Sequence, residues 1–117
     1  MIWDKAEELG RLIGQTPEYQ ALRRAETSLR EDKDTQAKLD QIQRLARQVD
    51  QLVAQGQMPD QPTAEAYETA VRDLEASGTG QAYVVARANF EKLMNKVNQR
   101  IGEGMEKGAT SSIITLS

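Results

Sequence analysis

Neither histidine nor cysteine occurs among the 117 residues of this chain. Zinc sites, cysteine-ligated iron–sulfur clusters, haem ligation by histidine, and nucleophiles activated by histidine all need one of these two residue types. The absence of cysteine also excludes disulfides. Any catalysis would have to rely on carboxylates, lysine, tyrosine or hydroxyl groups. We therefore expect a protein that is not an enzyme, with no catalytic, cofactor-binding or metal-binding residues.

Aromatic residues are also scarce, at 4% of the chain. A core must then consist mainly of Leu, Ile, Val and Ala, whose small side chains suit closely packed helices. A length of 117 residues predicts one domain. The two-residue alternation that is typical of a strand is missing, except in the last eight residues. These features together predict an all-α protein.

Long apolar runs and an excess of positive charge are missing as well. No run approaches the roughly 20 apolar residues that cross a membrane, and Asp4, Glu7 and Glu8 interrupt any signal-peptide pattern at the N-terminus. We expect a cytoplasmic protein that does not bind membranes. The net charge of −3 does not provide the basic surface that nucleic acids require, so direct binding of nucleic acid is not expected.

Apolar residues recur at helical spacing in five segments of the chain, which predicts a bundle of about five helices. Thr16 followed by Pro17 is a typical start, with the hydroxyl as N-cap and proline in the first turn. Asp34 and Thr63 are the expected N-caps of two later helices. The expected segments are 3–13, 17–30, 34–56, 63–77 and 80–104.

Two of these segments are long and carry a narrow apolar stripe, the pattern by which one helix packs along another. Shorter helices cannot cover both stripes from end to end. Either the two long helices form an antiparallel hairpin, or a second copy of the chain covers the remainder. We predict two long antiparallel helices in an intertwined or side-by-side homodimer. The candidate self-association seam comprises Leu39, Ile42, Ala46, Val49, Val53, Phe90, Leu93 and Val97.

The C-terminal end differs from the rest of the chain. Gly102, Gly104 and Gly108 weaken helix propensity, and no charge follows Lys107. We expect a single helical domain over residues 1–108 and a flexible tail over 109–117. The alternative for the tail is a strand that docks on a partner's sheet edge or groove.

Two further features leave alternatives open. A basic ridge on the last long segment could meet an acidic partner or RNA phosphates, or it could be a solvated face. Trp3, the only tryptophan, could anchor the first helix in a core or remain exposed for a partner. The candidate ridge consists of Arg87, Lys92, Lys96 and Arg100.

Several stretches of the chain resemble the YlbF/YmcA family of small all-helical bacterial proteins. They are AEELGRLI at 6–13, TPEYQAL at 16–22, LDQIQRL at 39–45 and ARANFEKLMNKVNQRI at 86–101, which follows a loop, QGQMP at 55–59. The resemblance implies a helical bundle, often dimeric, without established enzyme activity. It also implies complexes that influence competence, sporulation, biofilm formation and RNase Y-dependent mRNA processing.

Some members of that family hold iron–sulfur clusters through cysteines near the C-terminus. This chain has Ser111 and Ser112 in that region, so a cluster is not expected. We therefore predict a non-enzymatic helical regulatory protein that binds a second copy of itself and further helical proteins. The alternative is an RNA-associated accessory factor that uses the basic ridge, and the least favoured hypothesis is a carboxylate-based enzyme or metal protein.

Overall fold

The computed structural model describes the backbone of residues 1–116 and the side chains of residues 1–110. The described chain consists of helices without any strand, as the sequence predicts for an all-α protein of about five helices. The elements are α1 (Ile2–Gly14), α2 (Pro17–Glu31), α3 (Lys33–Ala54), α4 (Gln61–Ala76) and α5 (Gly78–Leu116).

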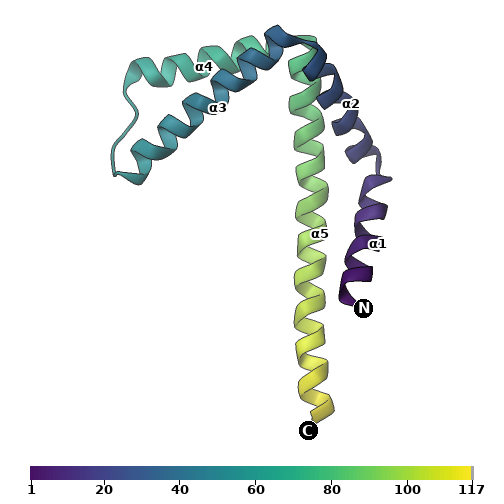
Figure 1. The fold of residues 1–117 in the computed structure, drawn as a ribbon. Coiled ribbons are helices and arrows are strands. Elements are labelled where there is room, and N and C mark those ends of the chain that lie inside the picture. Colours follow the sequence, from purple (N-terminus) through teal and green to yellow (C-terminus); the bar gives the residue numbers. More distant parts are fainter. Residues whose placement is uncertain (117) are drawn as a thin grey trace.

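The helices form two arms that meet at one corner (Figure 1). One arm is built on α5, with α2 and then α1 running beside it, and the other is an antiparallel hairpin of α3 and α4. The molecule measures 62 × 38 × 18 Å. Each arm is only about two helices across, with α1 and α2 beside α5 in one arm and α3 beside α4 in the other. Each arm therefore keeps helix faces that nothing in the same chain covers.

The buried apolar side chains gather where the two arms meet. They are small in number and in size, and they come from α2, α4 and α5. Helix α2 contributes Ala25 and Leu29, α4 contributes Ala70 and Leu74, and α5 contributes Ala86. The alanines allow the helix backbones to approach closely, as expected for a chain with few aromatic residues. The core is therefore at the corner and does not extend along the arms.

A polar junction lies beside this core and links the starts of α3 and α5. Thr35 is only 2% exposed. Its hydroxyl donates to Asp32 Oδ2 at 2.7 Å and lies 2.9 Å from Ser77 Oγ, which in turn accepts a hydrogen bond from the Gly80 amide at 3.3 Å. The hydrogen bonds from the Thr35 hydroxyl and amide hold the pKa of Asp32 below its usual value of 3.8. The junction thus connects residues that are 42 positions apart in the sequence.

Replacement of Thr35 by valine should destabilise the protein by about 1–3 kcal/mol, because Asp32 and the half-buried Ser77 hydroxyl then lose a hydrogen-bond partner. The pKa of Asp32 should rise toward 3.8, since the largest cause of its lowering is removed. Urea denaturation and an NMR titration of the Asp32 carboxyl measure both effects. Thr27→Val is the control: the Thr27 hydroxyl donates to the Arg23 carbonyl and accepts from Arg30, but all of these groups are exposed, so a change within about 0.5 kcal/mol is expected. Equal losses in the two variants would contradict a role of the junction.

Within one chain the two long helices do not form an antiparallel hairpin, so that alternative is wrong, whereas coverage of the stripes by a second copy stays a prediction. Helices α3 and α5 approach each other only near the corner, whereas α3 packs along α4 and α5 packs along α2. The connection between α3 and α4 is a short loop, so these neighbours fold back on each other and α4 covers the α3 stripe. Only Ser77 separates α4 from α5, and its extended backbone sends α5 away from the hairpin.

Two predicted N-caps are also wrong, although the third is confirmed. The Thr16 hydroxyl accepts from the Tyr19 amide at 3.2 Å, as expected for the cap of α2. The cap of α3 is Asp32 in place of Asp34, and the cap of α4 is Asp60 in place of Thr63. In both cases an aspartate two or three residues earlier reaches the third amide of the helix. Pro62 is tolerated in the first turn because the amide that it lacks would have no partner there.

The backbone of α5 continues past the three glycines to Leu116, so the expected end of this helix near residue 104 is wrong. The side chains of residues 111–117 lie outside the described part of the chain. The division into a domain at 1–108 and a tail at 109–117 therefore stays a prediction.

Candidate interaction surfaces

The α3 half of the predicted seam lies in the hairpin. Its first four residues, Leu39, Ile42, Ala46 and Val49, are half-buried on the side of α4, whereas Val53 is 59% exposed. Coverage by α4 therefore decreases toward the outer end of the hairpin.

At that outer end an apolar hollow of about 340 Å³ opens between the two helices, which we call the tip hollow. Beside it, in the connecting loop, Met58 is 86% exposed, and Tyr67 on α4 is 37% exposed. Asp50 and Glu68 add carboxylates to the lining. The tip hollow is lined by Ala46, Val49, Asp50, Pro59, Ala64, Tyr67 and Glu68. An uncovered apolar surface with an acidic border thus lies at the end of the hairpin.

The α5 half of the predicted seam faces α1 and α2. Phe90 packs on Tyr19 of α2 with ring centroids 5.7 Å apart, a tilted aromatic pair. Leu93 and Val97 are half-buried further along α5. The seam predicted from sequence therefore divides into two halves on different arms. Its role in self-association is a prediction that the fold alone does not test.

Helix α1 runs beside this part of α5 without packing closely against it. It is the most strongly amphipathic of the five helices, yet none of its residues is buried. No Cα atom of α1 comes within 8 Å of a Cα atom of α5. An apolar hollow of about 380 Å³ remains between them, which we call the arm groove, and its lining consists of Leu9, Leu93, Lys96, Val97, Arg100 and Ile101. The sequence predicted the stripe on each helix but not the space between them.

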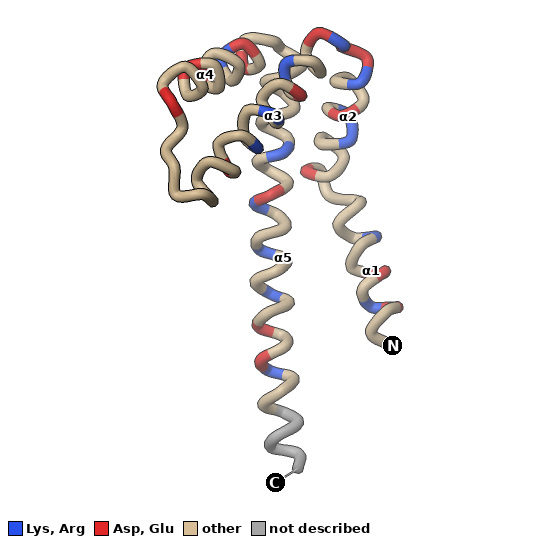
Figure 2. The backbone as a smooth tube through the Cα atoms, turned by 60° about the vertical axis from the view of Figure 1, so that its left-hand side comes forward, with Lys and Arg blue, Asp and Glu red and all other residues tan. Residues whose placement is uncertain are grey.

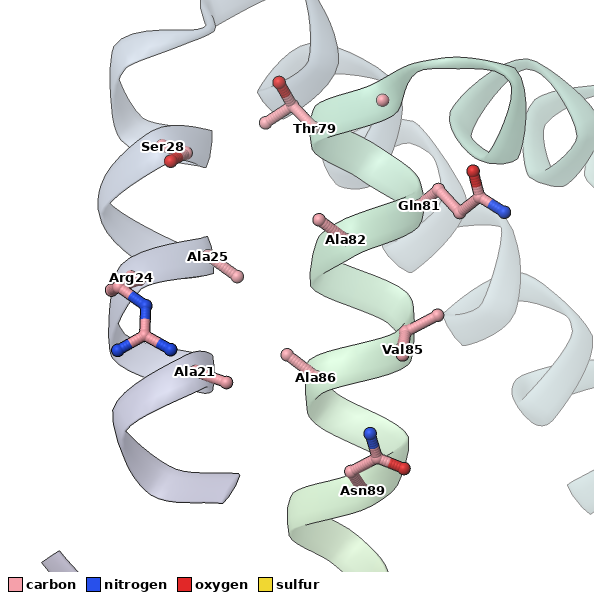
Figure 3. A pocket seen from close by; sticks show the side chains of 11 residues that line it. Ala21, Arg24, Ala25, Ser28, Thr79, Gln81, Ala82, Val85, Ala86 and Asn89 are labelled. Atoms are coloured by element: carbon pink, nitrogen blue, oxygen red, sulfur yellow. The ribbon is translucent and has the colours of Figure 1, made fainter. Parts of the chain in front are cut away.

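A wide hollow of about 740 Å³ lies over α2 and α5 close to the corner. Figure 3 shows Ala21 and Ala25 pointing toward Ala82 and Ala86 across the space between the helices. The hollow is wide because these side chains are short, and Arg24 supplies its only charge. Five of the eleven lining residues are polar, namely Arg24, Ser28, Thr79, Gln81 and Asn89, and the others are small or apolar.

The basic ridge is exposed along α5, but acidic residues interrupt it. Figure 2 shows positive and negative residues following one another along this helix. Arg87 pairs with Glu91 at 3.3 Å, and Arg100 pairs with Glu103 at 3.4 Å. Lys92 and Lys96 make no ion pair with a described side chain. The ridge therefore offers a short basic segment and not a continuous surface for a phosphate backbone.

We expect single-stranded RNA to bind more weakly than about 10⁻⁴ M at physiological salt, because so few cations are available for phosphates. Filter binding across a salt series is the measurement. A control variant, Glu91→Gln with Glu103→Gln, removes the two carboxylates that pair with Arg87 and Arg100. Tight, salt-dependent binding by the natural chain would support the RNA-associated alternative instead.

Trp3 is not a core anchor in this chain, since its side chain is 79% exposed, and Ile2 beside it is 69% exposed. The alternative, exposure for a partner, stays open.

Among the described residues, no three acidic side chains converge as metal ligands would. In the same part of the chain, no helix combines the length and the apolar character that crossing a lipid bilayer requires.

Comparison with known proteins agrees with the helical arrangement. A solved structure, Bacillus subtilis RicA in complex with RicF, superposes with a TM-score of 0.64 at 16% sequence identity, covering 92% of this chain and 96% of that one. At this identity the likeness shows a shared fold alone. No curated protein sequence matches the chain. Residues 2–106 match the family described as "Control of competence regulator ComK, YlbF/YmcA". Because that match spans nearly the whole chain, this protein belongs to the YlbF/YmcA family.

Proposed function

We propose that this protein acts in the cytoplasm as a non-enzymatic regulator, by binding a second copy of itself or another helical protein through its helix faces. Membership of a family described as controlling a competence regulator supports a regulatory role. The protein of similar fold, RicA, was crystallised with a protein partner, RicF. We therefore propose that the protein takes part in the control of competence.

One observation carries the proposal, namely the surface that the single chain leaves exposed. Its accessible area is 9099 Å², whereas a compact monomer of 13.0 kDa exposes roughly 6,300 Å². Its radius of gyration is 19.9 Å, against about 13 Å for a compact domain of this length. The chain therefore buries much less surface than its size permits.

The excess is large enough for a stable interface, and part of it is apolar. A typical specific interface buries about 1,600 Å² in total, which is less than this excess. The exposed apolar side chains occur at the free ends of both arms as well as on α5. They include Ile2, Trp3, Leu12, Val53, Met58, Val85, Ile101 and Met105. Association would remove such groups from water and supply the core that the single chain lacks.

Light scattering and sedimentation between about 1 and 100 µM test the proposal. We expect a dimer, and we expect the thermal midpoint to rise with protein concentration, because association stabilises the folded state by mass action. A sharp monomer at every concentration, with an unfolding midpoint independent of concentration, would count against self-association. If no partner were then found in the host, the proposal as a whole would fail.

A further inference from the structure

We propose that two copies of this chain pair reciprocally, with the hairpin tip of each copy docked into the arm groove of the other. The hairpin tip is the segment 48–68 at the outer end of α3 and α4, with the loop that joins them. The inference rests on the self-association proposed above and adds which surfaces meet. It follows from three properties of these surfaces: what each leaves uncovered, how charge is distributed between them, and where they lie in the chain.

Each surface has apolar groups that its own copy does not cover. In the arm groove, Leu9 and Ile101 face a space that α1 and α5 do not close. At the hairpin tip, Val53 and Met58 are 59% and 86% exposed. Methionine is unbranched and flexible, so it fills irregular apolar gaps well. The tip thus offers projecting apolar side chains, and the groove offers an apolar space of about 380 Å³.

Charge is segregated between the two surfaces. No lysine or arginine lies between Arg47 and Arg72, and this stretch carries the acids Asp50, Asp60, Glu65 and Glu68. Conversely, no acid lies between Glu91 and Glu103, and this stretch carries the bases Lys92, Lys96 and Arg100. Both hollows contain members of these sets, since Asp50 and Glu68 line the tip hollow and Lys96 and Arg100 line the arm groove.

The remaining charges near the groove do not cancel this difference. On α1, Glu7 pairs with Arg11 at 3.4 Å and Glu8 with Lys5 at 3.7 Å. On α5, Glu103 engages Arg100 and leaves Lys96 without an ion pair among the described side chains. The groove is therefore net basic, and an acidic apolar surface is its natural complement.

A single copy cannot make this contact. The hairpin tip and the arm groove lie on different arms, and no Cα atom of α1 comes within 8 Å of α3 or α4. Since each copy has one tip and one groove, a two-fold pair satisfies both surfaces of both copies. A partner of unrelated sequence would need the same acidic, apolar character, and this chain already supplies it.

Charge reversal tests the pairing. The groove variant is Lys96→Glu with Arg100→Glu, and the tip variant is Asp50→Lys with Glu68→Lys. Each alone places like charges opposite each other in both contacts of a dimer, so we expect each to weaken dimerisation by at least about tenfold. Mixed in equal amounts, the two variants should recover a dimer, because each reversed groove then meets a reversed tip of the other variant. Sedimentation of each variant and of the mixture gives the dissociation constants.

The matched control is Arg23→Glu with Arg30→Glu, which makes the same change of charge on exposed positions of α2 that line neither hollow. We expect it to dimerise like the natural chain. A natural dimer that neither reversal weakens, or that the mixture does not recover, overturns the docking while self-association stands. A natural chain that stays monomeric overturns the docking together with self-association.

A second measurement does not depend on how well the reversed variants fold. Because the chain has no cysteine, single variants Met58→Cys and Ile101→Cys can be mixed and oxidised without side reactions at other thiols. We expect a disulfide-linked heterodimer in the mixture at several times the yield obtained with Met58→Cys and Arg23→Cys. Equal yields with both pairs would overturn the docking.

Discussion

Replacement of Gly80 by alanine should destabilise the protein by about 1–3 kcal/mol or more, the range seen when an extra carbon is forced into a packed site. An added Cβ would overlap the carbonyl oxygen of Leu74 and lie 2.8 Å from its Cδ1 atom. Leu74 is 4% exposed and cannot move outward into solvent. We place the effect at the upper end of this range, because a backbone atom has to move and not only a flexible side chain. Urea denaturation followed by circular dichroism measures the change.

Gly104 provides the matched control for this substitution. It lies on α5 as well, it is exposed, and an added Cβ would meet nothing within 4 Å. Gly104→Ala should therefore stabilise the protein by about 0.5–1 kcal/mol, since alanine loses less backbone entropy in a helix than glycine. The two substitutions are chemically identical and should have opposite signs. If both stabilise the protein, α4 and α5 do not approach each other at Gly80 as closely as described.

The helices could be predicted from the sequence because helix formation depends on residues that are close together in the chain. The spacing of Leu39, Ile42 and Val49 requires a helix, whatever the partner of that helix is. The Thr16 cap was predictable because the hydroxyl and the Tyr19 amide that it accepts from are three residues apart. The caps of α3 and α4 were misplaced because Asp32 and Asp34, or Asp60 and Thr63, are equally good local candidates.

The pairing of the helices could not be predicted in the same way. Apolar burial has no direction, so the stripe on α3 matches the stripe on α5 as well as it matches α4. What separates the arms is a single extended residue, Ser77, and a hydrogen bond to Thr35 across 42 positions. A pattern of apolar residues contains no information about such a contact. Membership of the YlbF/YmcA family, by contrast, was correctly predicted, since it rests on whole stretches of sequence.

The candidate surfaces were predicted in part. The stripe residues were identified, but Val53 on one stripe and Leu93 and Val97 on the other were grouped in a single self-association seam, because the division into arms was unknown. The basic ridge was identified, whereas the acidic tip was missed. That signal was present in the sequence, because the stretch between Arg47 and Arg72 has no base at all. This acidic stretch suggests a contact between copies only once the tip and the groove are known to lie on separate arms, and the fold is needed to know that.

The small core at the corner leads to a last prediction, for Leu29 on α2. Among the side chains of residues 1–110, only two leucines are in the buried apolar set, and Leu29 is one of them at 7% exposure. Leu29→Ala should cost about 2–5 kcal/mol, from lost burial and from the cavity that remains. Because the stability of a small domain is about 5–15 kcal/mol, this one substitution removes a large share of it. Thermal denaturation at fixed protein concentration measures the loss.

A leucine-to-alanine substitution on α1 tests whether the core is confined to the corner or extends along the arms. Leu12 is 57% exposed, so Leu12→Ala should change the free energy of unfolding by no more than about 0.5 kcal/mol. A similar loss at both leucines would mean that α1 is packed as firmly as α2. A large loss at Leu29 alone would mean that the corner holds the two arms together, while α1 and the hairpin tip remain available for a partner.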